Sequence, residues 1–197
     1  MRPPIPALAI AGGLFVLALG AAAGGAAAEL SKTPDVADTS FVTADGARTL
    51  QQSVTIAAPA AALWKAFADT EEFKRWNSPV AAVDLRVGGT LEASYDPKHA
   101  LGDPDNIKHR IVTFLPGRLI VFQNIQAPRD LPDAQAFQRT VTIVQYDPAG
   151  DGRTRVTISS TGWATDAPSA RLYHFFQVDN AELLEKMKTV YEARATQ

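Results

Sequence analysis

The sequence predicts an α+β fold, in which a curved antiparallel sheet of about seven strands packs against one long C-terminal helix. Two observations carry this prediction. Between residues 50 and 163, short runs that alternate apolar and polar residues are separated by turn signals, which is typical of strands joined by hairpins. After Ala167-Pro168 the apolar spacing changes to the 3.6-residue period of an amphipathic helix. A sheet with one apolar face can bury that face under such a helix.

One strand and two short helices open the expected domain. In residues 50–56 the apolar side chains fall on even positions, as in a half-buried strand. Pro59 suits the first turn of a helix, because its missing N–H would have no partner there. Asp69, with Glu72 three residues later, predicts the cap of a second short helix that ends at Asn77-Ser78-Pro79. Two short helices therefore follow the first strand directly.

The middle of the chain predicts three hairpins, and the last part predicts the long helix. The expected strand pairs are 80–87 with 90–95, 107–114 with 119–125, and 137–146 with 154–163. Gly88-Gly89 and Pro116-Gly117 separate the strands of the first two pairs. The helix spans about six turns, and its apolar stripe consists of Tyr173, Phe176, Asn180, Leu184, Met187 and Tyr191.

Residues 1–28 predict an export signal. Arg2 gives a basic start, residues 5–19 form an apolar run, and the small residues Ala26 and Ala28 precede Glu29. We therefore expect cleavage near Ala28 and a periplasmic or secreted mature protein. The alternative is an uncleaved anchor, because the uncharged run approaches the roughly 20 residues of a bilayer span. The Gly and Ala content and the lack of a basic flank after the run favour cleavage, so we expect no stable membrane insertion.

Composition limits the remaining possibilities. Residues 29–48 are polar and without periodicity, which predicts a tether, and residues 49–197 have the size of one domain. The chain has no Cys, so disulfides and thiol chemistry are excluded. The formal net charge is −2 and no run of Lys or Arg stands out, so nucleic acid is not an expected partner. Both a monomer and a homodimer stay open.

Several short motifs resemble those of one superfamily. They are Ala57-Ala58-Pro59, Leu63-Trp64-Lys65-Ala66-Phe67, Phe73-x-x-Trp76, Val87-Gly88-Gly89, Pro116-Gly117-Arg118-Leu119 and Gly152-x-Thr154-Arg155-Val156. The chain resembles the helix-grip (SRPBCC, START-like) superfamily, which includes START lipid-binding domains, polyketide cyclases and the major birch-pollen allergen. It is most similar to bacterial domains that resemble the C-terminal part of the activator of a heat-shock chaperone ATPase. The resemblance implies a cavity between the sheet and the long helix and a small hydrophobic ligand. The sequence has no dinucleotide fingerprint and no phosphate-binding glycine loop, so no cofactor is expected.

Seven residues are candidates for binding that ligand. On the expected elements, they converge on a pocket of about 300–1,000 Å³; they are Phe67, Trp76, Tyr95, His109, Gln123, Phe176 and Asn180. Two positions depart from the superfamily pattern. Gln123 stands where relatives often have Trp, and Val178-Asp179-Asn180-Ala181 stands where they often have an aromatic residue. Both departures predict a cavity that is more polar than usual.

Two of the polar candidates, His109 and Asn180, each allow two interpretations. His109 shares a strand face with Ile107 and Ile111, so it is expected to point inward. It can serve as a general acid or base, or simply bond to a neighbour at the cavity rim, which we favour. Asn180 on the apolar stripe needs a hydrogen-bond partner, either a ligand or backbone near the helix start. Tyr95 and Gln123 are both placed to reach a ligand oxygen.

The loop 96–106 collects Asp and His and suggests a metal site, but its spacing matches neither a calcium loop nor a zinc site. A turn-rich solvated loop, or a lid over the cavity, is the expectation, with no metal. The function that we expect is non-catalytic binding of a small hydrophobic molecule. The alternative is a polyketide cyclase or dehydratase-like enzyme that uses His109 and Tyr95. Export argues against activation of a cytosolic chaperone ATPase.

Overall fold

The computed structural model describes residues 33–195, so the expected export signal lies outside the described residues. The strands of this part are β1 (Ala37–Asp38), β2 (Phe41–Val42), β3 (Arg48–Ile56), β4 (Val80–Val83), β5 (Thr90–Ser94), β6 (Ile107–Leu115), β7 (Leu119–Gln126), β8 (Val141–Pro148) and β9 (Thr154–Trp163). Its helices are α2 (Ala60–Ala68), α3 (Thr70–Trp76), α4 (Ala134–Gln138) and α5 (Ala167–Ala195).

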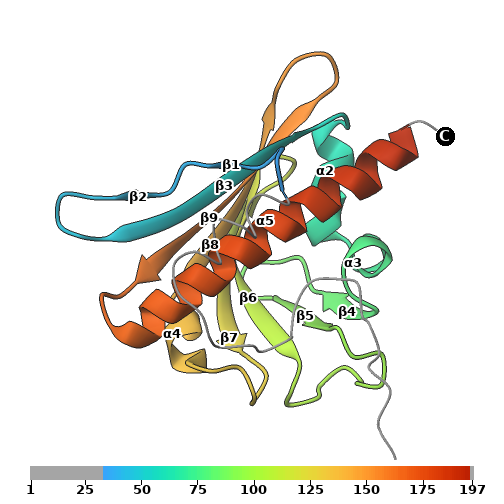
Figure 1. Cartoon of the computed structure of the whole chain (residues 1–197). Coiled ribbons are helices and arrows are strands. Elements are labelled where there is room, and N and C mark those ends of the chain that lie inside the picture. Colours follow the sequence, from blue (N-terminus) through green and yellow to red (C-terminus); the bar gives the residue numbers. More distant parts are fainter. Residues whose placement is uncertain (1–32, 196–197) are drawn as a thin grey trace, which may run out of the picture.

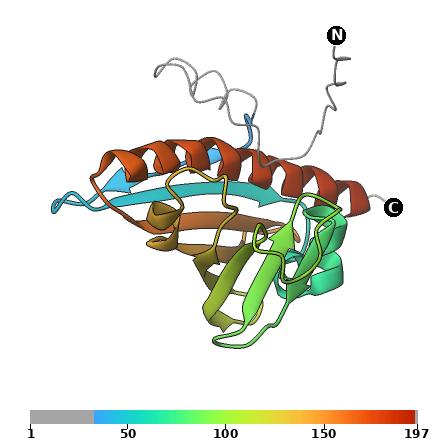
Figure 2. The same cartoon turned by 90° about the horizontal axis from the view of Figure 1, so that it is seen from below.

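The strands form one antiparallel sheet that is covered by α5. The strand order is β1-β3-β9-β8-β7-β6-β5-β4, with β2 paired to β3 beside β1. Figure 1 shows α5 running diagonally across this sheet, and Figure 2 shows the sheet curving away below the helix. The helices α2 and α3 close the end of the sheet near the C-terminus of α5. The predicted α+β helix-grip architecture is therefore confirmed.

Local sequence accounts for the early elements. Burial alternates along β3, where Gln52, Val54 and Ile56 are buried and their neighbours are half-buried. The Asp69 carboxylate accepts a hydrogen bond from the backbone N–H of Glu72 at 2.8 Å, so it caps α3 as predicted. The indole N–H of Trp76 then donates to the Ala66 carbonyl at 2.8 Å and fixes α3 against α2.

Three regions of the chain differ from the prediction. Residues 37–42, which the sequence predicts to be part of the tether, form the two short strands β1 and β2, so the described part contains nine strands. The strand expected from residue 80 stops at Val83, because residues 84–89 turn away. The strand expected from Phe137 starts only at Val141, because residues 134–138 form α4. Their sequence, Ala-Gln-Ala-Phe-Gln, consists mostly of good helix formers.

The apolar core forms two clusters between the sheet and the helices. The larger cluster includes Leu184, Met187 and Tyr191 of α5 against the concave face of the sheet. The smaller one, around Trp163 and Leu172, lies under α4. A polar contact joins the two layers: the buried Gln52 side chain donates to the Gln177 carbonyl of α5 at 2.8 Å.

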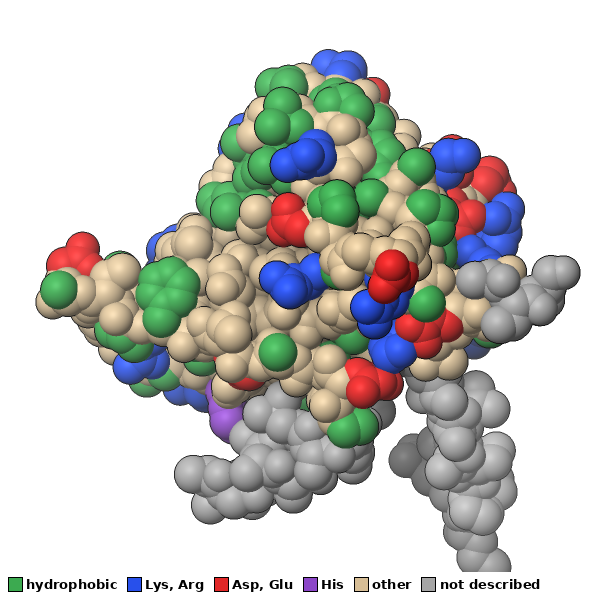
Figure 3. All heavy atoms as spheres, turned by 90° about the horizontal axis from the view of Figure 1, so that it is seen from above, with side chains coloured by type: hydrophobic (Ala, Val, Ile, Leu, Met, Phe, Trp, Pro, Cys, Tyr) green, Lys and Arg blue, Asp and Glu red, His purple; other side chains and the backbone are tan. Residues whose placement is uncertain are grey.

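The outer surface is mixed in character. Figure 3 shows Lys and Arg side chains intermingled with Asp and Glu over one face, with several hydrophobic side chains near the upper end of the view. Large apolar side chains are exposed at Phe41, Val42, Val87, Leu101, Val112, Leu115 and Ile125. Among residues 33–195, no helix combines the length and the apolar character that a membrane span requires.

Candidate functional site

A cavity of about 120 Å³ lies between α5 and the concave face of the sheet. Aromatic side chains reach it from several elements, namely Phe67 of α2, Phe73 of α3, Phe122 of β7, Phe137 of α4, Trp163 of β9, and Phe175 and Phe176 of α5. The cavity is smaller than the expected range of about 300–1,000 Å³, because these rings pack against one another. The ring centroids of Phe137 and Phe176 are 4.7 Å apart, and those of Trp163 and Phe176 are 6.1 Å apart.

The polar part of the lining is small. It consists of Asn77, Tyr95, His109, Thr140, Thr142, Ser160, Asp179 and Asn180. Three of these residues titrate, namely Tyr95, His109 and Asp179, and the lining from the described part of the chain includes no Lys or Arg. The cavity thus offers an apolar body with hydrogen-bonding groups and one acid, which is the usual composition of a small-molecule site.

The structure brings five of the seven predicted residues to this cavity. They are Phe67, Tyr95, His109, Phe176 and Asn180. Trp76 is instead a core residue: it is buried, and its ring packs on Phe67 and Phe73 with centroid distances of 5.5 and 6.1 Å. It therefore supports the cavity wall from behind and does not contribute to the lining.

The placement of Gln123 on the cavity face was wrong. Along β7 the side chains of Ile120, Phe122 and Asn124 are buried, so Gln123 lies on the opposite face. There its side-chain oxygen accepts a hydrogen bond from the Arg110 guanidinium at 2.6 Å. Residues 119–125 are apolar on both faces apart from Gln123 and Asn124, so alternation alone does not fix the orientation of this strand.

His109 points inward, as the alternation on β6 predicts. Its ring lies 6.0 Å from the ring of Phe122 and 5.8 Å from that of Phe137, measured between centroids. Its Nδ1 atom is buried and has no hydrogen-bond partner in the described part of the chain. Burial lowers the pKa of His109 to about 4, so the ring is neutral near pH 7.

Asp179 is the titratable residue that the sequence reasoning missed. Its side chain lines the cavity and is 9% exposed. Burial raises the pKa of its carboxyl to about 7, with a smaller contribution from the negative charge of Glu182. The signal was present in the sequence, because Asp179 directly precedes Asn180 on the inner side of the helix, and a buried acid there is as unusual as a buried amide.

Tyr95 and Asn180 complete this polar end of the cavity. The Tyr95 hydroxyl donates to the Asn77 side-chain oxygen at 3.5 Å. Burial raises the pKa of Tyr95 well above its usual value, and the nearby Asp179 carboxylate raises it further, so the hydroxyl stays protonated. The Asn180 amide is buried. Within residues 33–195 it has no side-chain hydrogen bond like those that fix Gln52 or Asn106, so the backbone contact that we considered for it is not observed.

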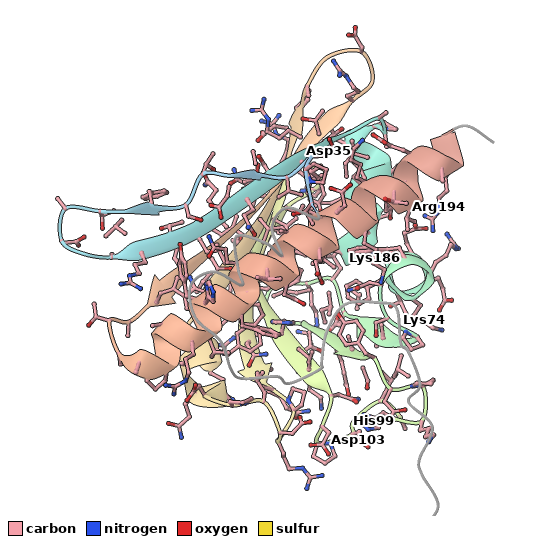
Figure 4. All side chains as sticks on the ribbon, in the orientation of Figure 1. Asp35, Lys74, His99, Asp103, Lys186 and Arg194 are labelled. Carbon is pink, nitrogen blue, oxygen red and sulfur yellow. The ribbon has the colours of Figure 1, made fainter. Side chains whose placement is uncertain are left out.

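The loop between β5 and β6 is held together by its own hydrogen bonds. Figure 4 shows that His99 and Asp103 both lie in this loop, away from α5. The His99 Nδ1 atom lies 2.9 Å from the Ser94 hydroxyl, and the Asn106 amide donates to Glu92 at 2.7 Å. The described residues contain no group of three or more His, Cys, Asp or Glu that is placed to hold a metal ion.

The curved antiparallel sheet and the long C-terminal helix across its concave face define a helix-grip domain. A family model described as "Polyketide cyclase / dehydrase and lipid transport" matches residues 47–192. The match covers most of the chain, which belongs to this family. The family finding agrees with the resemblance to the SRPBCC superfamily predicted from the motifs. A comparison with curated proteins finds no match.

Solved structures share the fold at low sequence identity. A Mesorhizobium loti protein is 18% identical with a TM-score of 0.57, over 76% of this chain and 99% of that one. A Mycobacterium smegmatis protein is 21% identical with a TM-score of 0.53, over 82% and 98%. The Aha1 dimer of Colwellia psychrerythraea is 15% identical with a TM-score of 0.52, over 71% and 96%. At these identities the likeness establishes the fold alone.

Proposed function

We propose that the protein is an exported binding protein for a small, mostly hydrophobic molecule that occupies the cavity under α5. The observation that carries the binding proposal is an aromatic-lined cavity under α5 whose polar lining includes the buried, unpartnered Nδ1 atom of His109. Leaving such a group unpaired costs about 1–3 kcal/mol, and a ligand removes that cost. The family description, which includes lipid transport, supports the same function.

The volume of the cavity supports a small ligand. About 120 Å³ is less than a drug-sized ligand needs, and the walls are packed aromatic rings. Export is supported by a separate observation, the uncharged run that ends at Ala28.

Native mass spectrometry of the protein purified from the periplasm tests the binding proposal. The expected result is a small molecule that co-purifies with the wild type. Ala93→Leu, which adds three carbons to a buried cavity-lining residue, should lose that molecule. Ala57→Leu, at an exposed position, is the matched control and should retain it. Wild-type protein that carries no such molecule and takes up no small apolar compound contradicts the proposal.

A second candidate function is catalysis of a cyclase or dehydratase type. The observation in its favour is Asp179, whose pKa of about 7 suits a general base near neutral pH. The pair that we first considered is less suitable, because the pKa of His109 is lowered to about 4 and that of Tyr95 is strongly raised. Incubation of the co-purified molecule with the protein separates the two functions. Recovery of the unchanged molecule supports a binder, whereas turnover that Asp179→Asn abolishes supports an enzyme.

A further inference from the structure

The cavity holds a buried acid that no cation balances. Among residues 33–195, Asp179 makes no ion pair, although twelve such pairs join other residues there. No described side chain or backbone amide donates a hydrogen bond to its carboxylate, in contrast to Asp69 at the start of α3. A buried carboxylate without a partner lowers the stability of the folded protein, so its presence calls for a functional explanation.

The charged groups around Asp179 cannot supply the missing cation. Glu182, on the same helix, is an acid, and Tyr95, which follows β5 and lines the same cavity, is neutral. His109 on β6 is neutral near pH 7 because burial lowers its pKa to about 4. Lys186 extends from α5 toward α3, where its Nζ donates to the Asn77 carbonyl at 3.3 Å (Figure 4). No cation of the described chain pairs with Asp179, so the carboxyl is neutralised either by a proton or by a cation that enters the cavity.

The rest of the cavity suits an organic cation. Aromatic rings attract a cation over their faces, and the effect increases when the site is desolvated. Phe175 and Phe176 come from the turn of α5 that precedes Asp179, and Phe73 and Phe122 reach the same cavity from α3 and β7. The Asn180 side-chain oxygen is an additional acceptor next to the carboxylate along the helix.

We propose that the ligand is a small organic amine with an aromatic or alicyclic body, and that its ammonium group binds the Asp179 carboxylate. This inference rests on the proposed binding function and specifies its ligand class. The apolar body occupies the space between the rings, and the ammonium donates to Asp179 and Asn180. The same charge distribution rejects carboxylates and phosphates, because an anion would lie beside an unpaired acid with no Lys or Arg in the described lining.

Three probes of equal skeleton test the charge preference. They are 2-phenylethylamine, 2-phenylethanol and phenylacetate, titrated into the full-length mature protein by isothermal calorimetry at pH 8. We expect the amine to bind at least about 10-fold more tightly than the alcohol, since a charge-assisted hydrogen bond is roughly twice as strong as a neutral one. Phenylacetate should bind more weakly than the alcohol.

The dependence on pH and two variants assign the preference to Asp179. The carboxyl has a pKa of about 7, and the amine stays protonated below pH 8, so affinity for the amine should fall about 10-fold from pH 8 to pH 6. Asp179→Asn should abolish both the preference for the amine and its pH dependence, while keeping affinity for the alcohol. Glu182→Gln, at an exposed position one turn further along α5, is the control and should keep the preference.

The outcomes separate the inference from the proposed function. Binding of the alcohol or of phenylacetate as tightly as the amine, or a co-purified molecule without a basic nitrogen, overturns the amine inference and leaves the binding function standing. An amine preference that survives in Asp179→Asn also overturns it. Absence of any bound molecule, together with no binding of any of the three probes, overturns the binding function itself.

Discussion

At the scale of single residues, the cavity lining contains two titratable groups, Asp179 and His109, whose effects on stability have opposite pH dependence. Burial raises the pKa of Asp179 to about 7 and lowers that of His109 to about 4. In both cases the neutral form is favoured in the folded state, because the charged form loses its hydration there. As pH rises from about 4 to 6.5, Asp179 lowers the stability of the ligand-free protein while His109 raises it, so the two effects largely cancel in that range.

The first prediction concerns Asp179→Asn. The folded-state pKa of Asp179 is above its unfolded value, so its carboxyl destabilises the ligand-free protein increasingly as pH rises from about 4 to about 7. The amide has the same shape and no charge. We expect the variant to match the wild type near pH 4 and to exceed its free energy of unfolding by a few kcal/mol at pH 8. Urea denaturation at both pH values measures this, and a variant with equal or lower stability at pH 8 contradicts it.

The second prediction concerns His109→Phe. The folded-state pKa of His109 is lowered, so its contribution to stability is complete above the unfolded pKa of 6.5 and is lost as pH falls toward 4. Phe cannot protonate, and it also removes the buried unpaired Nδ1. The variant should therefore lose less thermal stability than the wild type between pH 7 and pH 4. The exposed His174 provides the control, because His174→Phe should leave this acid-side slope unchanged.

The third prediction concerns Asn180→Leu, which separates ligand binding from packing. The amide is buried and lines the cavity without a described side-chain hydrogen bond, so Leu should keep or raise the melting temperature of the ligand-free protein. Affinity for the co-purified molecule should fall. A lower melting temperature with unchanged affinity would show that Asn180 serves packing instead.

At the scale of elements, β9 passes so close to the end of α4 that Gly162 has no room for a side chain. Gly162 has a φ of +85°, and a Cβ there would lie 2.5 Å from the Arg139 carbonyl oxygen at the end of α4. The next residue, Trp163, lines the cavity. The close approach of β9 to α4 therefore positions one wall of the site.

The fourth prediction follows from this contact. Gly162→Ala should destabilise the protein by about 3 kcal/mol, because a left-handed φ and a clash with backbone add together. Gly117→Ala is the matched control: its φ is +71°, but a Cβ there meets nothing within 4 Å, so only the conformational cost of about 1 kcal/mol applies. Chemical denaturation compares the two. Equal losses would show that the contact with Arg139 relaxes without cost.

The sequence was sufficient for elements that local chemistry determines. The Asp69 cap, the turns at Gly88 and Gly117, and the apolar period of α5 each follow from a few neighbouring residues. The sequence did not predict α4. A helix of five residues is too short to show a helical period, and the alternating pattern of the strand that follows predicts a start already at Phe137. The short strands β1 and β2 exist only because β3 offers an edge for pairing, which is a tertiary effect.

The site residues also divide into those that local sequence places correctly and those that depend on tertiary contacts. His109 was placed correctly because the charged residues Lys108 and Arg110 on either side of it indicate the outer face of β6. Gln123 was misplaced because its strand has no such marker, although its partner across the sheet is the outward-facing Arg110. The pairing of Gln123 with Arg110 would have shown that Gln123 faces outward. Asp179 was missed because several side chains of one helical turn face the sheet, and residue spacing alone does not show which of them line the cavity.

At the scale of the whole molecule, the fifth prediction concerns export. We expect the mature protein to begin at or within a few residues of Glu29, because small residues at Ala26 and Ala28 suit cleavage there. N-terminal sequencing of protein from the periplasm or the culture medium measures this. Protein in those fractions that still begins at Met1 would contradict the prediction and favour an uncleaved anchor.

The pairing of β3 with β9 determines when this protein can fold. Ile56 pairs with Thr154 and Arg48 with Trp163, so the strand that starts the domain must wait for a partner about a hundred residues later. Contacts this distant in sequence slow folding, and α5 has to follow before the cavity has its second wall. A chain that emerges progressively from a ribosome thus stays incomplete until its last quarter is available. If the chain is exported as proposed, slow folding would leave it extended while it crosses the membrane, and the cavity would form only after translocation.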